Sequence, residues 1–176
     1  MSNGSVPTTG RREEREGRAC LVLERTFRAP IDHVWAAVTE PARLVRWIGT
    51  WDGDPDEGSV QFRMTAEGED VDAQTFHIRE CTPPTRLVVD SQAPYDTDVP
   101  VDWRIELTLS ESDGVTTLEF VQGLPEPRVA ENVGPGWEYY LDRLVAAESG
   151  GDVTGVVWDD YYPAQSAPYA AMFRTG

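Results

Sequence analysis

Three aromatic side chains lie close together in the segment GPGWEYYLDRLVA, residues 134–146. They are Trp137, Tyr139 and Tyr140, and a tyrosine can in principle act as an acid or a base. That role requires a base or a metal that lowers the phenol pKa from about 10. The neighbouring sequence supplies neither, so it favours core packing or a place on the wall of a ligand cavity for Trp137 and Tyr140.

Arg25 is the polar residue with the clearest potential for binding. In ACLVLERTF, residues 19–27, strand alternation puts Arg25 on the same face as Leu21, Leu23 and Phe27. A guanidinium on that face could hold a ligand carboxylate through two parallel hydrogen bonds. A solvated strand end, or a bulge that reverses the alternation, is the simpler interpretation.

The other reactive residue types form no catalytic or metal-binding pattern. His33 and His77 are expected on exposed faces, and no order or spacing suggests a Ser–His–acid arrangement. Cys20 and Cys81 are not spaced as zinc ligands. The acidic loop 52–58 lacks the EF-hand pattern, and no glycine-rich phosphate loop is present. We therefore expect no metal and no cofactor.

Composition excludes several classes of partner. The chain has 176 residues and a formal net charge of -16, which argues against nucleic acid and anionic membrane surfaces because both carry phosphates. The sequence has no run of about 18 apolar residues, so we expect no membrane insertion. The N-terminus has no apolar stretch behind its charges, so it does not match a secretory signal, and we expect a cytoplasmic protein.

The expected elements follow a simple order. The strand 19–27 precedes two short helices, within 29–40 and 41–49, and a long helix covers about 133–148. Between them, period-two patterns predict five further strands, at 58–66, 70–81, 85–91, 101–110 and 115–123. Six strands in near-unbroken sequence indicate an α+β fold with a curved antiparallel sheet that is covered on one face.

Three segments are expected along the chain. Residues 1–17 are rich in small and charged residues and predict a disordered tail. Residues 18–150 form one domain. Residues 151–176 are unusually aromatic for a free end, so this extension is expected to pack on the domain.

The ordered set of segments resembles a known family. RTFRAPIDHVWAAVTEPARLVRWIG, GSVQFRM, ECTPPTRLVV, DGVTTLEFVQGLPEP and GWEYYLDRLV are together similar to the Hsp90-ATPase-activator-homologue (AHSA1-like) branch of the START-like, or SRPBCC, superfamily. The resemblance covers roughly residues 19–148. The tail segment DDYYPAQSAPY is similar to an extension found on some bacterial members.

The resemblance implies a helix-grip (START-like, Bet v 1-like) fold, in which a curved sheet wraps the long C-terminal helix around a cavity. The cavity lining expected from the strand and helix patterns combines apolar and polar positions: Arg25, Phe62, Met64, Phe76, Trp103, Ile105, Leu107, Leu118, Phe120, Gln122, Trp137, Tyr140, Leu141 and Leu144. Large side chains at these positions could also simply fill the space.

Three functions remain open at this point. The leading hypothesis is a binding module for a hydrophobic or aromatic small molecule. The second is a cyclase- or hydrolase-like enzyme that works in the cavity with Arg25, Gln122 and Tyr140, a set too thin to favour it. The third is an Hsp90-type co-chaperone, which ranks low because 17 N-terminal residues cannot replace the extra domain of the eukaryotic co-chaperone. The sequence does not identify the ligand. It also leaves the oligomeric state open, with a homodimer among the alternatives.

Overall fold

One antiparallel sheet of eight strands forms the body of the protein. The computed structural model describes residues 6–68, 71–96, 99–124 and 127–174. The strands lie in the order β1-β2-β8-β7-β6-β5-β4-β3. Their bounds are β1 Arg11–Arg15, β2 Arg18–Phe27, β3 Thr50–Asp52, β4 Ser59–Arg63, β5 Gln74–Thr82, β6 Arg86–Asp96, β7 Val99–Ser112 and β8 Val115–Gly123.

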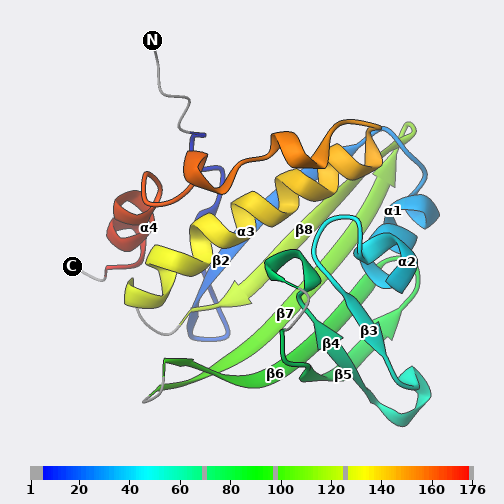
Figure 1. The fold of residues 1–176 in the computed structure, drawn as a ribbon, viewed down its shortest axis with the longest axis horizontal. Helices are drawn as coiled ribbons and strands as arrows, with labels where there is room; N and C mark the ends of the chain where they lie inside the picture. Colours follow the sequence, from blue (N-terminus) through cyan, green and yellow to red (C-terminus); the bar gives the residue numbers. More distant parts are fainter. Residues whose placement is uncertain (1–5, 69–70, 97–98, 125–126, 175–176) are drawn as a thin grey trace.

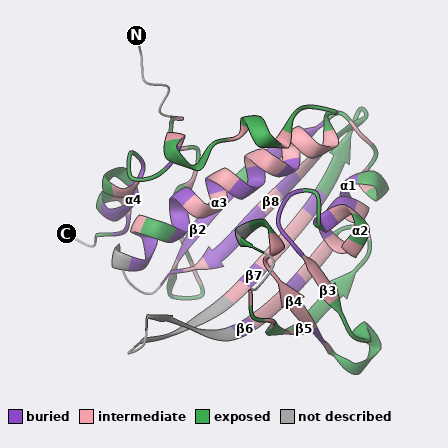
Figure 2. Ribbon diagram, in the orientation of Figure 1, coloured by how far each residue is buried: buried purple, intermediate pink, exposed green. Residues whose placement is uncertain are grey.

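The helices cover one face of this sheet unevenly. Figure 1 shows the long helix α3 crossing β2 and β8, while α1 and α2 lie toward β3. Buried positions gather along α3, β2 and β8, whereas β5 is mostly half-buried or exposed (Figure 2). The helices are α1 Ile31–Thr39, α2 Pro41–Leu44, α3 Pro127–Glu148 and α4 Ser166–Phe173, with short 3-10 turns η1 Pro55–Glu57, η2 Thr65–Glu67, η3 Val153–Gly155 and η4 Trp158–Asp160.

The α+β helix-grip fold is confirmed, but the sheet has eight strands where six were expected. One added strand, β1, lies inside the segment expected to be disordered and pairs with β2 through a two-residue turn. Both turn residues, Glu16 and Gly17, have positive φ, the conformation that suits a tight hairpin. The charged sequence RREER of this edge strand carries no hydrophobic period, so the pattern could not indicate it.

Helix α3 begins at Pro127, six residues before the expected start near Val133. Pro135 lies inside it and has no N–H to bond the carbonyl of Glu131, as a helix would otherwise require. That carbonyl instead accepts a 2.9 Å hydrogen bond from the Ser166 hydroxyl of α4. A Cβ added at Gly134 would lie 2.4 Å from the ring of Tyr169. The GPG segment is therefore where α4 docks.

The C-terminal extension packs on the domain. Tyr161, Tyr169 and Phe173 are all buried, and α4 lies beside α3. The extension is also tied to the N-terminal segment, since the side-chain amide of Gln165 donates to the carbonyl of Val6. No helix in the described ranges is long and apolar enough to cross a membrane.

Candidate functional site

A cavity of about 830 Å³ lies between α3, the α1–α2 pair and the concave face of the sheet. Figure 2 shows α3 over β2 and β8, and among the described residues no helix lies along β4 to β6. Protein cavities that hold small molecules typically measure about 300–1,000 Å³. The space is therefore large enough for an organic ligand, even though many of the surrounding side chains are bulky.

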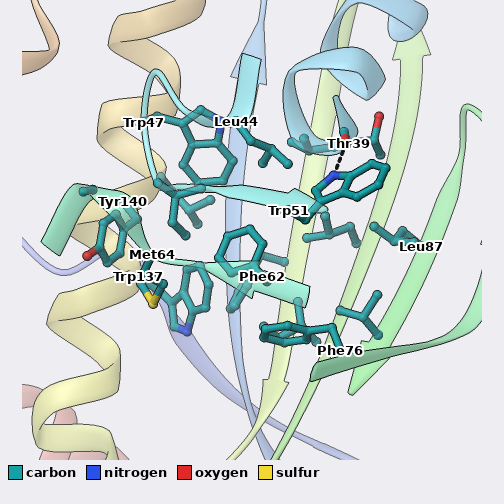
Figure 3. A pocket seen from close by; sticks show the side chains of 18 of the residues that line it. Thr39, Leu44, Trp47, Trp51, Phe62, Met64, Phe76, Leu87, Trp137 and Tyr140 are labelled. Carbon is teal, nitrogen blue, oxygen red and sulfur yellow. Dashed lines mark hydrogen bonds between the residues drawn. The ribbon is translucent and has the colours of Figure 1, made fainter. Parts of the chain in front are cut away.

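Tryptophan rings dominate the wall. Five tryptophans line the wall that the structure describes: Trp35, Trp47, Trp51, Trp137 and Trp158. Three of the five indole N–H groups donate to protein oxygens: Trp47 to the Ala37 carbonyl at 3.0 Å, Trp51 to the Thr39 carbonyl at 2.7 Å (Figure 3), and Trp137 to Gln122 Oε1 at 2.6 Å. With their polar atoms engaged, these rings offer apolar surface to a ligand.

Few polar groups interrupt this wall. The described wall carries no Asp, Glu, His or Arg side chain. Its polar members are Thr39, Gln74, Asn132 and two tyrosines, Tyr139 and Tyr140, together with the thiol of Cys81. Gln74, Asn132 and Cys81 are exposed, so they lie where the cavity meets solvent. The arrangement suits an apolar body with few polar contacts.

Ten of the expected lining residues lie on this wall, and Figure 3 labels five of them: Phe62, Met64, Phe76, Trp137 and Tyr140. The full set is Phe62, Met64, Phe76, Ile105, Leu107, Leu118, Phe120, Trp137, Tyr140 and Leu141. The side chain of Trp103 lies outside the described residues. Whether any of the ten contacts a ligand stays a prediction.

Arg25 does not belong to the described cavity wall, because its guanidinium is bound by carboxylates of the protein itself. Arg25 lies on the buried face of β2, as its alternation predicted, but its Nη2 donates to Glu138 Oε1 at 2.9 Å and its Nε to Asp142 Oδ1 at 3.0 Å. The hydroxyl of Thr9 accepts from the same guanidinium. Arg25 is 9 % exposed and Glu138 only 1 %, so this guanidinium is not available to a ligand.

Two further expected lining residues are buried behind the wall. Gln122 is fully buried, and its side-chain oxygen accepts from Trp137, which lies on the wall in front of it. Its amide nitrogen has no partner within the described residues. Leu144 is also fully buried and belongs to the apolar core. Both are buried, and neither belongs to the described cavity wall.

The Arg25 cluster joins four segments of the chain. Glu138 accepts from the backbone N–H of Thr9 at 2.6 Å and from the hydroxyl of Tyr169 at 2.9 Å. The hydroxyl of Tyr161 donates to Asp142 at 2.6 Å. Burial, reinforced by the adjacent carboxylates, raises the pKa of both phenols well above the usual value. This cluster fastens the N-terminal segment and the extension onto α3.

Sequence reasoning missed the contribution of α1, α2 and β3. The residues from this part of the chain that line the cavity include Trp35, Leu44, Trp47, Ile48 and Trp51. The helical spacing of Leu44, Trp47 and Ile48 indicated burial, but nothing in that spacing distinguishes a core face from a cavity face. Only the curvature of the sheet, which no local pattern records, decides between them.

The same reasoning missed the edge formed by Tyr139 and Trp158. Their ring centroids are 5.4 Å apart at an interplanar angle of 77°, and both rings line the cavity. Trp158 also stacks on Tyr162 of the extension, at 5.4 Å and 7°. Trp158 remains 38 % exposed. The C-terminal extension therefore supplies part of the cavity rim.

A second ion-pair cluster lies at the C-terminal end of α3. The carboxylate of Glu148 contacts Arg43 of α2 and His33 of α1, whose Nε2 lies 2.9 Å away. His33 is exposed, and none of the three residues belongs to the cavity wall. The cluster links the short helices to α3.

Comparison with known proteins gives a consistent result. The model of the family described as Activator of Hsp90 ATPase homolog 1-like protein matches residues 28–148. The crystal structure of CalU16 from Micromonospora echinospora superimposes with a TM-score of 0.70 and 25% identity, covering 96% of this chain and 98% of that one. No curated protein matches.

Two other solved structures share the fold at lower identity. DynU16, from the dynemicin biosynthetic locus, has a TM-score of 0.59 and 23% identity over 76% of this chain and 49% of that one. A protein from Arthrobacter aurescens has a TM-score of 0.63 and 17% identity over 81% of this chain and 93% of that one.

Proposed function

Since the chain belongs to the Activator of Hsp90 ATPase homolog 1-like family, we propose that it is a binding module for a hydrophobic or aromatic small molecule held in the central cavity. The observation that carries this proposal is the space itself, about 830 Å³ lined mainly by aromatic and aliphatic side chains. In a cavity of that size and character, binding becomes more favourable with each part of the apolar ligand surface that is removed from water.

The tryptophans define the chemistry of the proposed ligand. Rings whose N–H groups already donate to the protein can offer a ligand only stacking and dispersion contacts. A rigid, apolar and preferably aromatic body gains most from such contacts. No contact or charge in the described part of the chain favours the enzyme or co-chaperone hypothesis. The biosynthetic locus of DynU16 is compatible with a small-molecule ligand but names none for this chain.

The proposal is tested by thermal shift and native mass spectrometry with hydrophobic acids, sterols and aromatic polyketides. A ligand at a hundred times its Kd should stabilise the fold by about 2.7 kcal/mol. Failure of every class to bind or stabilise the protein would contradict the proposal.

Gly136 provides a matched pair of variants that locates the binding. It lines the cavity, and a Cβ added to it meets no atom within 4 Å. Gly136→Leu should fill part of the space and abolish the thermal shift, while Gly136→Ala should retain it. Equal binding by both variants would place the ligand outside the cavity.

A further inference from the structure

Arg143 on α3 lies at the seam between two parts of the cavity wall. Its Nε donates to the carbonyl of Trp47 at 2.9 Å, and its Nη1 donates to the hydroxyl of Tyr139 at 3.3 Å. The guanidinium carbon lies 5.4 Å from the centroid of the Tyr139 ring. Trp47 and Tyr139 both line the cavity, and Figure 3 shows Trp47 beside α3. The Arg143 guanidinium thus contacts two residues of this wall.

Arg143 differs from the other arginines packed on α3 in having no carboxylate. Arg25 is paired with Glu138 and Asp142, and Arg43 with Glu148. Within the described ranges no Asp or Glu oxygen lies within ion-pair distance of Arg143, although the chain has 31 acidic residues against 15 arginines. A half-buried guanidinium left unpaired in so acidic a chain is a position where an external anion would be stabilised.

Two hydrogen-bond donors remain at this point. Nη2 of Arg143 has no partner within the described residues and is not sealed inside the protein. The Tyr139 hydroxyl accepts from Arg143, and its own hydrogen has no acceptor in the described part of the chain. A guanidinium next to a phenol O–H matches the oxygens of a carboxylate or sulfonate, since both donors can bind one anionic group.

We propose that the cavity selects hydrophobic or aromatic acids, with Arg143 and Tyr139 holding the anionic oxygens while the tryptophan wall holds the apolar body. This inference rests on the proposed binding function and narrows its ligand class. The acidic residues nearest on α3 oppose it little, because Glu138 and Asp142 are already held by Arg25 and two tyrosines. The net charge of -16 repels anions at long range, so the selection must come from contacts at this edge.

Two fluorescent probes with one skeleton test the proposal. Anilinonaphthalene sulfonate carries a sulfonate, and N-phenylnaphthylamine is the same aromatic body without it. In Arg143→Gln, the Kd of the sulfonate should rise about tenfold, the loss expected for a charge-assisted hydrogen-bonded contact, while the Kd of the neutral probe should stay within about twofold. In Tyr139→Phe, which keeps the ring, the same selective loss should be smaller.

The controls separate this inference from the proposed function. Arg28→Gln removes the same charge at an exposed site outside the wall and should change neither Kd. Unchanged affinity for the neutral probe also shows that Arg143→Gln retains the folded cavity. Equal weakening of both probes, or of neither, would overturn the selection of acids while leaving the binding module intact. Failure of both probes to bind the unaltered protein would overturn the cavity proposal itself.

Discussion

The two sides of helix α3 differ in packing: one faces a cavity, and the other carries charged groups that are fully paired. Trp137, Tyr140 and Leu141 face a space that the protein leaves unfilled. Glu138 and Asp142, one position away, face a cluster in which the protein provides the partners. Polar residues are the usual candidates for a functional site in a sequence, yet in α3 these two are paired inside the protein. The open side is built almost entirely from apolar side chains.

The difference follows from what burial costs each kind of group. A buried charge without a partner is expensive, and the oxygens of Glu138 and Asp142 all accept hydrogen bonds, from Arg25, Thr9 and two tyrosine hydroxyls. An apolar wall next to an empty cavity loses only dispersion contacts. Incomplete packing is therefore tolerated on the apolar side and can be used for binding, whereas the polar side fastens the fold.

The largest effect on stability should come from removing the Arg25 guanidinium from its ion pairs. Arg25→Met leaves the carboxylate of Glu138 buried without its guanidinium, so the free energy of unfolding should fall by about 3–5 kcal/mol. Urea unfolding at neutral pH measures the loss. Glu24→Gln, at an exposed position on the same strand, should change it by less than about 0.5 kcal/mol. Full stability with selective loss of ligand binding would instead make Arg25 a ligand contact.

Alkaline pH should also lower the free energy of unfolding through the tyrosines of the Arg25 cluster. The pKa of Tyr161 and of Tyr169 lies above the ordinary value of 10.0 in the fold, mainly because both phenols are buried. Above pH 10 the unfolded chain therefore loses protons that the folded chain keeps. The free energy of unfolding should fall by about 1.4 kcal/mol per pH unit for each tyrosine. Below pH 9 the whole contribution is present.

Urea unfolding at pH 9, 10 and 11 measures this slope. Tyr161→Phe and Tyr169→Phe should each make it shallower, because each removes one titrating phenol. Tyr162→Phe is the matched control, since this ring is 37 % exposed and stacks on Trp158 outside the polar cluster. A slope that neither buried tyrosine affects would show that the polar cluster does not govern the alkaline response.

Much of this architecture could be predicted from local patterns. The alternation of β7 and β8, the stripe of α3 and the ordered family segments predicted a helix-grip sheet, and ten cavity-lining positions followed from the same patterns. Strand parity also placed Arg25 on the face of Leu21, Leu23 and Phe27, with which it is buried. These features depend on side-chain period, which the sequence records directly.

The remaining features depend on contacts between distant segments. Arg25 meets residues 113 and 117 positions away, so its real partners could not be read from its neighbours. The edge strand β1 has no apolar period, and Pro135 within α3 is tolerated only because Ser166 of α4 bonds the freed carbonyl. Trp158 reaches the cavity from beyond residues 28–148, the range that the family model matches.

Trp158 belongs to both regions, because it lies in the C-terminal extension and also lines the cavity. Trp158→Ala removes one aromatic wall and its edge contact with Tyr139, so the Kd of an aromatic ligand should rise about tenfold. Trp158→Phe should restore most of the affinity. Val157→Ala, at an adjacent exposed position outside the wall, should leave the Kd unchanged in fluorescence titration. The same loss from Val157→Ala would indicate a general loosening of the extension.

Ser166→Ala should give the smallest effect and tests how the extension is fastened at the GPG segment. Its hydroxyl satisfies the carbonyl of Glu131 that Pro135 leaves free, so the free energy of unfolding should fall by about 1 kcal/mol. Ser149→Ala removes another serine hydroxyl, at an exposed site, and should cost less. Hydrogen exchange should show α4 opening more often while the strands β7 and β8 keep their protection. Unchanged exchange in α4 would mean that Tyr169 against Gly134 suffices to hold it, and that the polar fastening of the extension is redundant there.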